Sequence, residues 1–127
     1  MAVYLLDTSV LVDFLRAHND RPALLRRLVE DGHHLAACPV TVAEVFAGMR
    51  EEEDQPTTAF LAGLRYYDLP PAAARTAGRF RYEWARKGQT LSLADTLIAT
   101  AAVHHGLVLL TDNAKHYPMP ELTLETP

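Results

Sequence analysis

The residues of this chain best suited to chemistry are four acids, each beside an apolar segment: Asp7, Glu44, Asp95 and Asp112. Carboxylates that lie close together repel one another, and they take up protons unless a cation neutralises them. Oxygen ligands select hard cations such as Mg²⁺ or Mn²⁺ over zinc. Such an ion lowers the pKa of a water molecule and stabilises charge on a leaving oxygen, which suits hydrolysis of a phosphodiester bond.

Two of these acids follow predicted strands. Asp7 comes directly after the apolar residues 3–6, and Asp112 comes after the strand-like run 107–111. Because binding crevices of parallel α/β folds lie at the carboxyl ends of the strands, both acids belong at one edge of the sheet. Asn113 stands beside Asp112, and adjacent side chains of an extended segment point to opposite faces. We therefore expect only one of the pair to face Asp7, although a turn at the edge lets both approach.

The other two acids stand near predicted helix starts. Glu44 is three residues after Thr41 and Asp95 three residues after Ser92, which predicts an acid in the first turn of each helix. The helices of an α/β unit run antiparallel to its strands, so these N-termini share the edge of Asp7. Taken singly, a capping box explains Glu44 and the helix dipole explains Asp95. A single site on one rim accounts for all the acids together.

Short apolar segments alternate with amphipathic ones along the chain. Strands are predicted at residues 3–6, 34–38, 66–69, 107–111 and 122–124. Helices are predicted at residues 10–16 (begun by Thr8 or Ser9), at 22–31, from Thr41, and at 58–65, 72–87 and 93–105. The charged stretch 50–56 is predicted to be a solvated loop. This alternation favours an α/β fold with a parallel sheet covered by helices on both faces.

Composition limits the classes of protein to consider. The 127 residues are enough for one domain with a core. The net charge of −4 argues against coating nucleic acid through bulk positive charge, but it permits an enzyme that uses a local patch and a metal. No apolar run approaches the roughly 18 residues of a membrane span, and the N-terminus lacks the features of a signal peptide. With Cys38 as the only cysteine, we expect a cytoplasmic protein without membrane contact.

Three segments resemble the PIN-domain ribonucleases, specifically the VapC-type toxins of bacterial type II toxin–antitoxin systems. They are YLLDTSVLVDFL, PVTVAEVFAGM and LSLADTLIATAAVHHGLVLLTDNAKHY. The resemblance covers almost the whole length. It implies a single PIN domain at residues 1–127, a Rossmann-like three-layer sandwich with a mainly parallel central sheet. It also implies a Mg²⁺- or Mn²⁺-dependent endoribonuclease that acts on RNA, forms a homodimer and is held inactive by a cognate antitoxin protein.

The same resemblance implies roles for single residues. By motif match, Asp7 and Asp95 are the principal metal-site acids and Glu44 is the third. Ser9 or Thr8 looks like the hydroxyl that supports the first acid.

The last motif departs from the family pattern. In the family, the fourth acidic or amide residue usually stands two positions after a threonine, which is Thr111 here. That position holds Asn113, whereas Asp112 carries the charge one position earlier. Because an amide oxygen can orient a metal-bound water, we expect Asn113 to line the site and Asp112 to add negative potential beside it.

Two other functions share parts of this pattern. A phosphatase or phosphotransferase with Asp7 as nucleophile also has an apolar strand that ends in aspartate. Such enzymes generally need a second acid two residues later, where Ser9 stands. A non-catalytic module that keeps the fold only to bind protein or RNA has no need of the three main acids.

Overall fold

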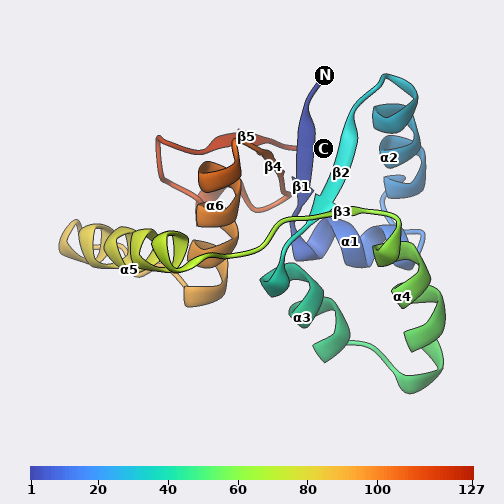
Figure 1. Cartoon of the computed structure of the whole chain (residues 1–127), viewed down its shortest axis with the longest axis horizontal. Coiled ribbons are helices and arrows are strands. Elements are labelled where there is room, and N and C mark those ends of the chain that lie inside the picture. Colours follow the sequence, from blue (N-terminus) through green and yellow to red (C-terminus); the bar gives the residue numbers. More distant parts are fainter.

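The computed structural model describes residues 1–127, and a five-stranded sheet forms its centre (Figure 1). The strands are β1 (Val3–Leu6), β2 (His34–Ala37), β3 (Arg65–Tyr66), β4 (Val108–Leu110) and β5 (Thr123–Glu125). Their order is β3-β2-β1-β4-β5, and every neighbouring pair is parallel. Because β1 is the central strand, the residue that follows it lies at the middle of the sheet's carboxyl edge.

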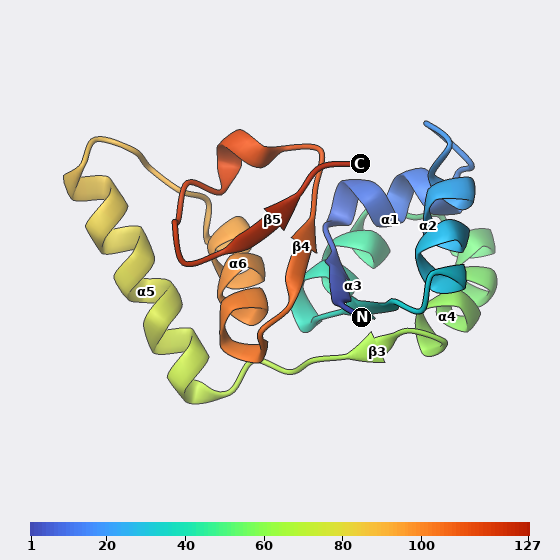
Figure 2. The same cartoon turned by 90° about the horizontal axis from the view of Figure 1, so that it is seen from above.

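Helices cover both faces of the sheet, as the alternating pattern predicts. They are α1 (Thr8–Leu15), α2 (Arg21–Glu30), α3 (Pro39–Ala47), α4 (Asp54–Ala62), α5 (Pro71–Arg86) and α6 (Leu93–His105), with short 3₁₀ helices η1 (Glu51–Glu53) and η2 (Ala114–His116). Figure 2 shows α5 and α6 on one side of the strands and α1, α2 and α4 on the other. The predicted α/β sandwich is confirmed. None of these helices is both long and apolar enough to span a membrane.

Successive strand residues fill two separate apolar cores. Leu5 of β1 packs with Ile98 of α6 in one core, and Leu6 packs with Leu11 of α1 in the other. Neighbouring side chains of a strand point to opposite faces, so a strand buried on both faces reads as a continuous apolar run. The two cores hold β1 firmly, and they therefore fix the position of the acid that follows it.

The acidic segment after α3 is not the loop that its charge predicts. Residues 51–53 form η1, and residues 54–62 form α4, which begins four residues before the predicted helix and ends three residues earlier. The backbone N–H of Arg50 donates to Glu53 Oε1 at 3.0 Å, so the acid caps the turn that begins the helical segment. Strand β3 is correspondingly short, at Arg65–Tyr66 in place of 66–69.

Helix α3 begins two residues before Thr41, the predicted start. Pro39 occupies the first position, which suits a residue without a backbone N–H. Cys38 is the N-cap residue, and its N–H donates to the Thr41 hydroxyl at 3.0 Å. The prediction that Glu44 lies in the first turn, like the capping-box explanation, is therefore wrong. Its carboxylate is left free for another contact.

Candidate metal and active site

Asp7 is the most enclosed acid of the predicted site, with 5% of its surface exposed. It joins β1 to α1 as the N-cap residue, so α1 begins at Thr8, one of the two residues predicted to start it, and the cap lies one residue earlier. Its Oδ1 accepts the backbone N–H of Thr8 at 2.8 Å, and its Oδ2 accepts the Thr111 hydroxyl at 2.6 Å. These donors hold the carboxylate in one orientation at the edge of the sheet.

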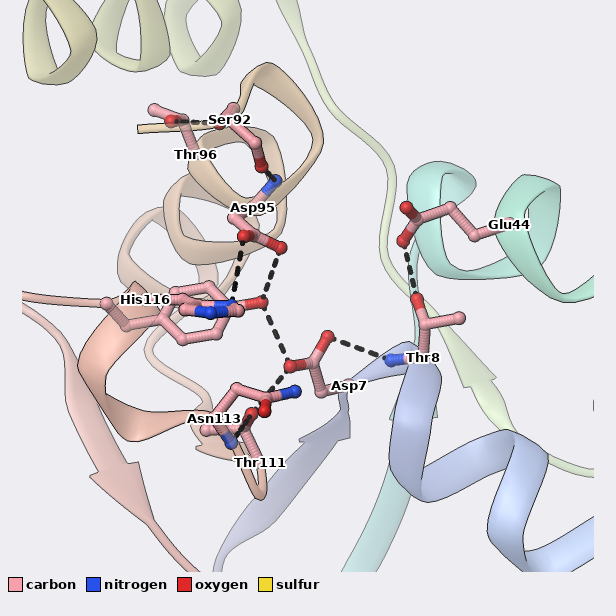
Figure 3. A network of polar contacts seen from close by, with 10 residues as sticks. Asp7, Thr8, Glu44, Ser92, Asp95, Thr96, Thr111, Asn113 and His116 are labelled. Atoms are coloured by element: carbon pink, nitrogen blue, oxygen red, sulfur yellow. Dashed lines mark hydrogen bonds and ion pairs between the residues drawn. The ribbon is translucent and has the colours of Figure 1, made fainter. Parts of the chain in front are cut away.

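Asp95 reaches the same place from the first turn of α6, as predicted. Ser92 caps this helix, because its hydroxyl accepts the backbone N–H of Asp95 at 3.0 Å. Asp95 Oδ2 lies 3.6 Å from His116 Nδ1. In Figure 3 the side chains of Asp95 and Asp7 point toward one another, and His116 and Asn113 lie beside them.

A buried tyrosine that the sequence does not single out lies between the two acids. Tyr117 is 5% exposed, and its Oη lies 3.0 Å from Asp7 Oδ2 and 3.2 Å from Asp95 Oδ1. Burial, together with the two carboxylates, raises the pKa of Tyr117 far above its ordinary value. The hydroxyl therefore keeps its proton and acts as a hydrogen-bond donor to the acids.

Glu44 faces the acids from α3, across from Asp95 in Figure 3. Its Oε1 accepts the Thr8 hydroxyl at 2.6 Å, and its Oε2 accepts no hydrogen bond. Thr8 therefore supports two acids at once, Asp7 through its backbone and Glu44 through its side chain. A supporting role for Thr8 was expected for the first acid alone.

The last motif separates its two polar residues. Asn113 lines the same cavity as Asp7, whereas Asp112 lies outside the cavity lining. Asp112 instead pairs with Arg21, whose Nη2 lies 2.6 Å from Asp112 Oδ1. The backbone N–H of Asn113 donates to the Thr111 hydroxyl at 3.0 Å, which fixes the turn after β4. The structure thus brings Asn113 to the acids and turns Asp112 away from them.

These side chains line one open cavity of about 570 Å³ at the carboxyl edge of the sheet. Its polar lining comprises Asp7, Thr8, Ser9, Asp13, Glu44, Ser92, Asp95, Asn113 and His116. The Ser9 hydroxyl is buried and has no hydrogen-bond partner within the protein. It does not support Asp7, because Thr111 and Tyr117 supply the side-chain donors to that carboxylate.

The chemistry of this donor set fits a hard divalent cation. Asp7 Oδ1 accepts only one hydrogen bond and Asp95 Oδ2 accepts none, so both oxygens keep lone pairs for a further ligand. No group of three His, Cys, Asp or Glu side chains lies close enough to enclose an ion alone. Mg²⁺ is usually bound through one or two carboxylates, several waters and substrate phosphates. A pair of carboxylates beside the unpaired Ser9 hydroxyl suits that coordination.

Sequence reasoning missed Asp13 and Tyr117. Asp13 stands within the first quoted motif, but a spacing of six residues from Asp7 matches no helical repeat, so the sequence gives no signal that it reaches the cavity. Tyr117 is the final residue of the last quoted motif, but nothing in its sequence neighbourhood distinguishes it from a core aromatic residue.

Comparison with known proteins agrees with the fold. The chain matches the PIN domain family over residues 4–122. It is 33% identical over 119 residues to ribonuclease VapC19 of Mycobacterium tuberculosis, covering 93% of this chain and 95% of that protein. It is 27% identical to the tRNA(fMet)-specific endonuclease VapC of Shigella flexneri, covering 92% of this chain and 91% of that protein.

The fold is also similar to that of a relative whose structure has been solved. The structure aligns with a chain of the VapBC2 complex of Rickettsia felis bound to a promoter DNA fragment, with a TM-score of 0.83 and 28% identity over 98% of each chain. The five-stranded parallel sheet and its acidic edge thus define a PIN domain. Within that class, the chain belongs to the VapC family, the ribonuclease toxins of VapBC toxin–antitoxin systems.

Proposed function

We propose that this chain is an endoribonuclease that uses Mg²⁺ or Mn²⁺ to hydrolyse phosphodiester bonds of RNA. The observation that carries the proposal is the convergence of Asp7 and Asp95 on one open cavity, in a chain that belongs to the VapC family. The two acids come from different elements, β1–α1 and α6, and a shared hydroxyl holds them close together.

Each polar residue of the cavity has a role in this proposal. Asp7 and Asp95 would hold the cation. When bound, the ion lowers the pKa of a water molecule and stabilises charge on the leaving oxygen. Glu44 Oε2, which accepts no hydrogen bond, is available to accept a proton from the attacking water. The Asn113 amide lines the cavity and is available to orient water.

The sequence beside Asp7 argues against an aspartyl-phosphate enzyme. The residue two positions later is Ser9, so the second acid of that chemistry is missing. A non-catalytic module that binds protein or RNA is also disfavoured, because the three main acids are all present and line one cavity.

The test of the proposal is cleavage of a single-stranded RNA by the purified protein. We expect cleavage with Mg²⁺ or Mn²⁺, none with excess EDTA, and none by Asp7→Asn under any of these conditions. Contamination by another nuclease would leave the Asp7→Asn preparation active. Cleavage that persists in EDTA would contradict the metal requirement, and a stable phosphate adduct on Asp7 would favour the phosphatase.

We propose further that the chain is the toxin of a cytoplasmic toxin–antitoxin pair. The acidic cavity invites an arginine or lysine side chain from a partner, which would form charge-assisted hydrogen bonds with the carboxylates. The antitoxin is expected to be encoded beside this gene. Co-expression and purification of the pair should give a complex without nuclease activity, and a complex with full activity would contradict the inhibitory role.

A homodimer is the oligomeric state that we propose for the active protein. The family resemblance supports it. Sedimentation equilibrium of the free chain should give twice the mass of the 14.1 kDa protomer. A monomer that cleaves RNA at the same rate per chain would contradict this part of the proposal.

A further inference from the structure

The Tyr117 hydroxyl contacts two acids that are far away in the sequence. Asp7 is 110 positions from Tyr117 and Asp95 is 22 positions from it, yet both carboxylates lie within 3.2 Å of the same oxygen. A phenol has one proton to donate. It therefore bridges the carboxylates by serving one of them at a time or by sharing its proton between them.

The ring of Tyr117 holds this hydroxyl in a fixed place. Tyr117 belongs to the apolar core between the sheet and α6, in the same cluster as Phe80, Ile98 and Met119. Its backbone N–H donates to the carbonyl of Ala114 at 3.0 Å, which closes the turn of η2. Since a packed core resists displacement, the hydroxyl keeps a fixed position between the two acids.

The hydrogen bonds of the site fall mainly on one oxygen of each acid, and the other oxygen keeps at least one lone pair free. Asp7 Oδ2 accepts both Thr111 and Tyr117, whereas Asp7 Oδ1 accepts only the backbone N–H of Thr8. Asp95 Oδ1 contacts Tyr117, whereas Asp95 Oδ2 accepts no hydrogen bond. In each carboxylate, the oxygen that faces Tyr117 is thus used in hydrogen bonds within the protein.

We infer that Tyr117 is a positioning residue of the metal site, whose hydroxyl sets the separation and orientation of Asp7 and Asp95 so that each presents its other oxygen to the cation. The inference rests on the proposed metal-dependent function. Hydrogen-bond partners of ligating carboxylates orient them, and removing such a partner typically weakens metal binding by about 10- to 100-fold.

The test is calorimetric titration of Mn²⁺ into the full-length protein, its Tyr117→Phe variant and a Tyr82→Phe control. Phenylalanine keeps the buried ring and removes only the hydroxyl. Tyr82 loses the same group from the surface of α5, where it is 64% exposed. We expect Tyr117→Phe to raise the Kd for Mn²⁺ by about 10- to 100-fold, and Tyr82→Phe to leave it unchanged. RNA cleavage by Tyr117→Phe should recover at saturating Mn²⁺, because the acids themselves remain.

Each other result has a distinct meaning. Wild-type protein that binds no Mn²⁺ would overturn the proposed function and this inference with it. Wild-type binding with an unchanged Kd in Tyr117→Phe would overturn the inference alone. A variant that binds Mn²⁺ normally but cleaves slowly at saturation would assign the hydroxyl to the reaction and not to positioning. A Tyr117→Phe protein that does not fold, judged by its far-UV circular dichroism, would make the hydroxyl a structural group and overturn the inference as well.

Discussion

One position along the chain decides which side chain of the last motif meets the acids. Asn113 lines the cavity, and Asp112 turns to Arg21 at 2.6 Å. The charge of Asp112 therefore serves a contact between the loop after β4 and the start of α2. An amide takes the place of a fourth carboxylate, which keeps the repulsion among the acids lower than a fourth charge would.

The different contacts of Asn113 and Asp112 predict different effects for alanine substitutions at the two positions. Asn113→Ala should weaken Mn²⁺ binding by about tenfold, as the loss of a group that orients a metal's waters does. Asp112→Ala should leave Mn²⁺ binding nearly unchanged and lower the free energy of unfolding by at most about 1 kcal/mol, since its ion pair is partly exposed. Calorimetry and urea unfolding measure the two effects. If Asp112→Ala were as damaging to binding as Asp7→Ala while Asn113→Ala was silent, charge and not position would identify the ligand.

Single residues differ in how visible their roles are in the sequence. Asp7 and Asp95 are predictable because each follows a local signal, the end of an apolar strand or a capping serine. Tyr117 is not predictable in this way, because its contact with Asp7 spans 110 positions and exists only once β1 and η2 are packed together. The family pattern suggests the Ser9 or Thr8 hydroxyl as the support of the first acid, but Thr8 contacts Asp7 through its backbone N–H, and the hydroxyl donors are those of Thr111 and Tyr117.

At the scale of elements, α6 delivers Asp95 because a serine begins it at the right residue. Ser92 caps the helix, and the bond that it accepts comes from the backbone N–H of Asp95 itself. The cap thus fixes the helix start and the position of the proposed metal-site acid together. The helix ends at Gly106, whose φ of 67° suits a residue without a side chain.

Ser92→Ala tests this coupling. Loss of the cap should lower the free energy of unfolding by about 1 kcal/mol, and fraying of the first turn should also weaken Mn²⁺ binding. Ser92→Asn keeps a capping oxygen and is the matched control. Thermal unfolding and calorimetric titration report the two effects. Full Mn²⁺ affinity in a destabilised Ser92→Ala protein would show that Asp95 keeps its place without the cap.

The boundaries of other elements depend on contacts that are weak signals in the sequence. Helix α6 was predictable to the residue because it is apolar, capped by a serine and ended by a glycine. The segment 50–56 was misread as a loop, because its charge outweighed the capping of Arg50 by Glu53. Helix α3 was expected to begin at Thr41, the commoner capping residue. Thr41 instead lies within the helix, where its hydroxyl accepts the backbone N–H of Cys38.

At the scale of the whole molecule, the proposed function requires a chain of net charge −4 to bind RNA, a polyanion. A lysine near the acids lies on η2, where Lys115 and the neighbouring His116 border a polar pocket of about 250 Å³. This pocket shares Asp95 and His116 with the acidic cavity. Lys115 forms no ion pair, so its charge is available to a phosphate group of RNA that passes the site.

The salt dependence of RNA binding tests whether Lys115 contacts an RNA phosphate. In an Asp95→Asn background, which prevents cleavage, the affinity for a 12-nucleotide single-stranded RNA is measured from 50 to 200 mM salt. Loss of one phosphate contact makes the negative slope of log K against log salt less steep by about 0.7 for single strands, which is the change expected for Lys115→Ala. Lys87→Ala removes the other lysine, whose ammonium lies 4.5 Å from the centroid of the Trp84 ring, and should leave the slope unchanged. Equal slopes in all three proteins would place the RNA elsewhere.

The central claim is that Asp7 and Asp95 together form a metal-dependent site for RNA cleavage. Asp95→Asn tests it most directly, because asparagine keeps the shape of the side chain and removes the charge that the cation needs. Relief of repulsion with Asp7 predicts a metal-free protein at least as stable as the wild type. The decisive measurement is the rate of RNA cleavage by folded Asp95→Asn at saturating Mg²⁺, with folding verified by thermal unfolding. The account predicts a rate no higher than that of wild-type protein in EDTA, and cleavage at the wild-type rate would contradict it.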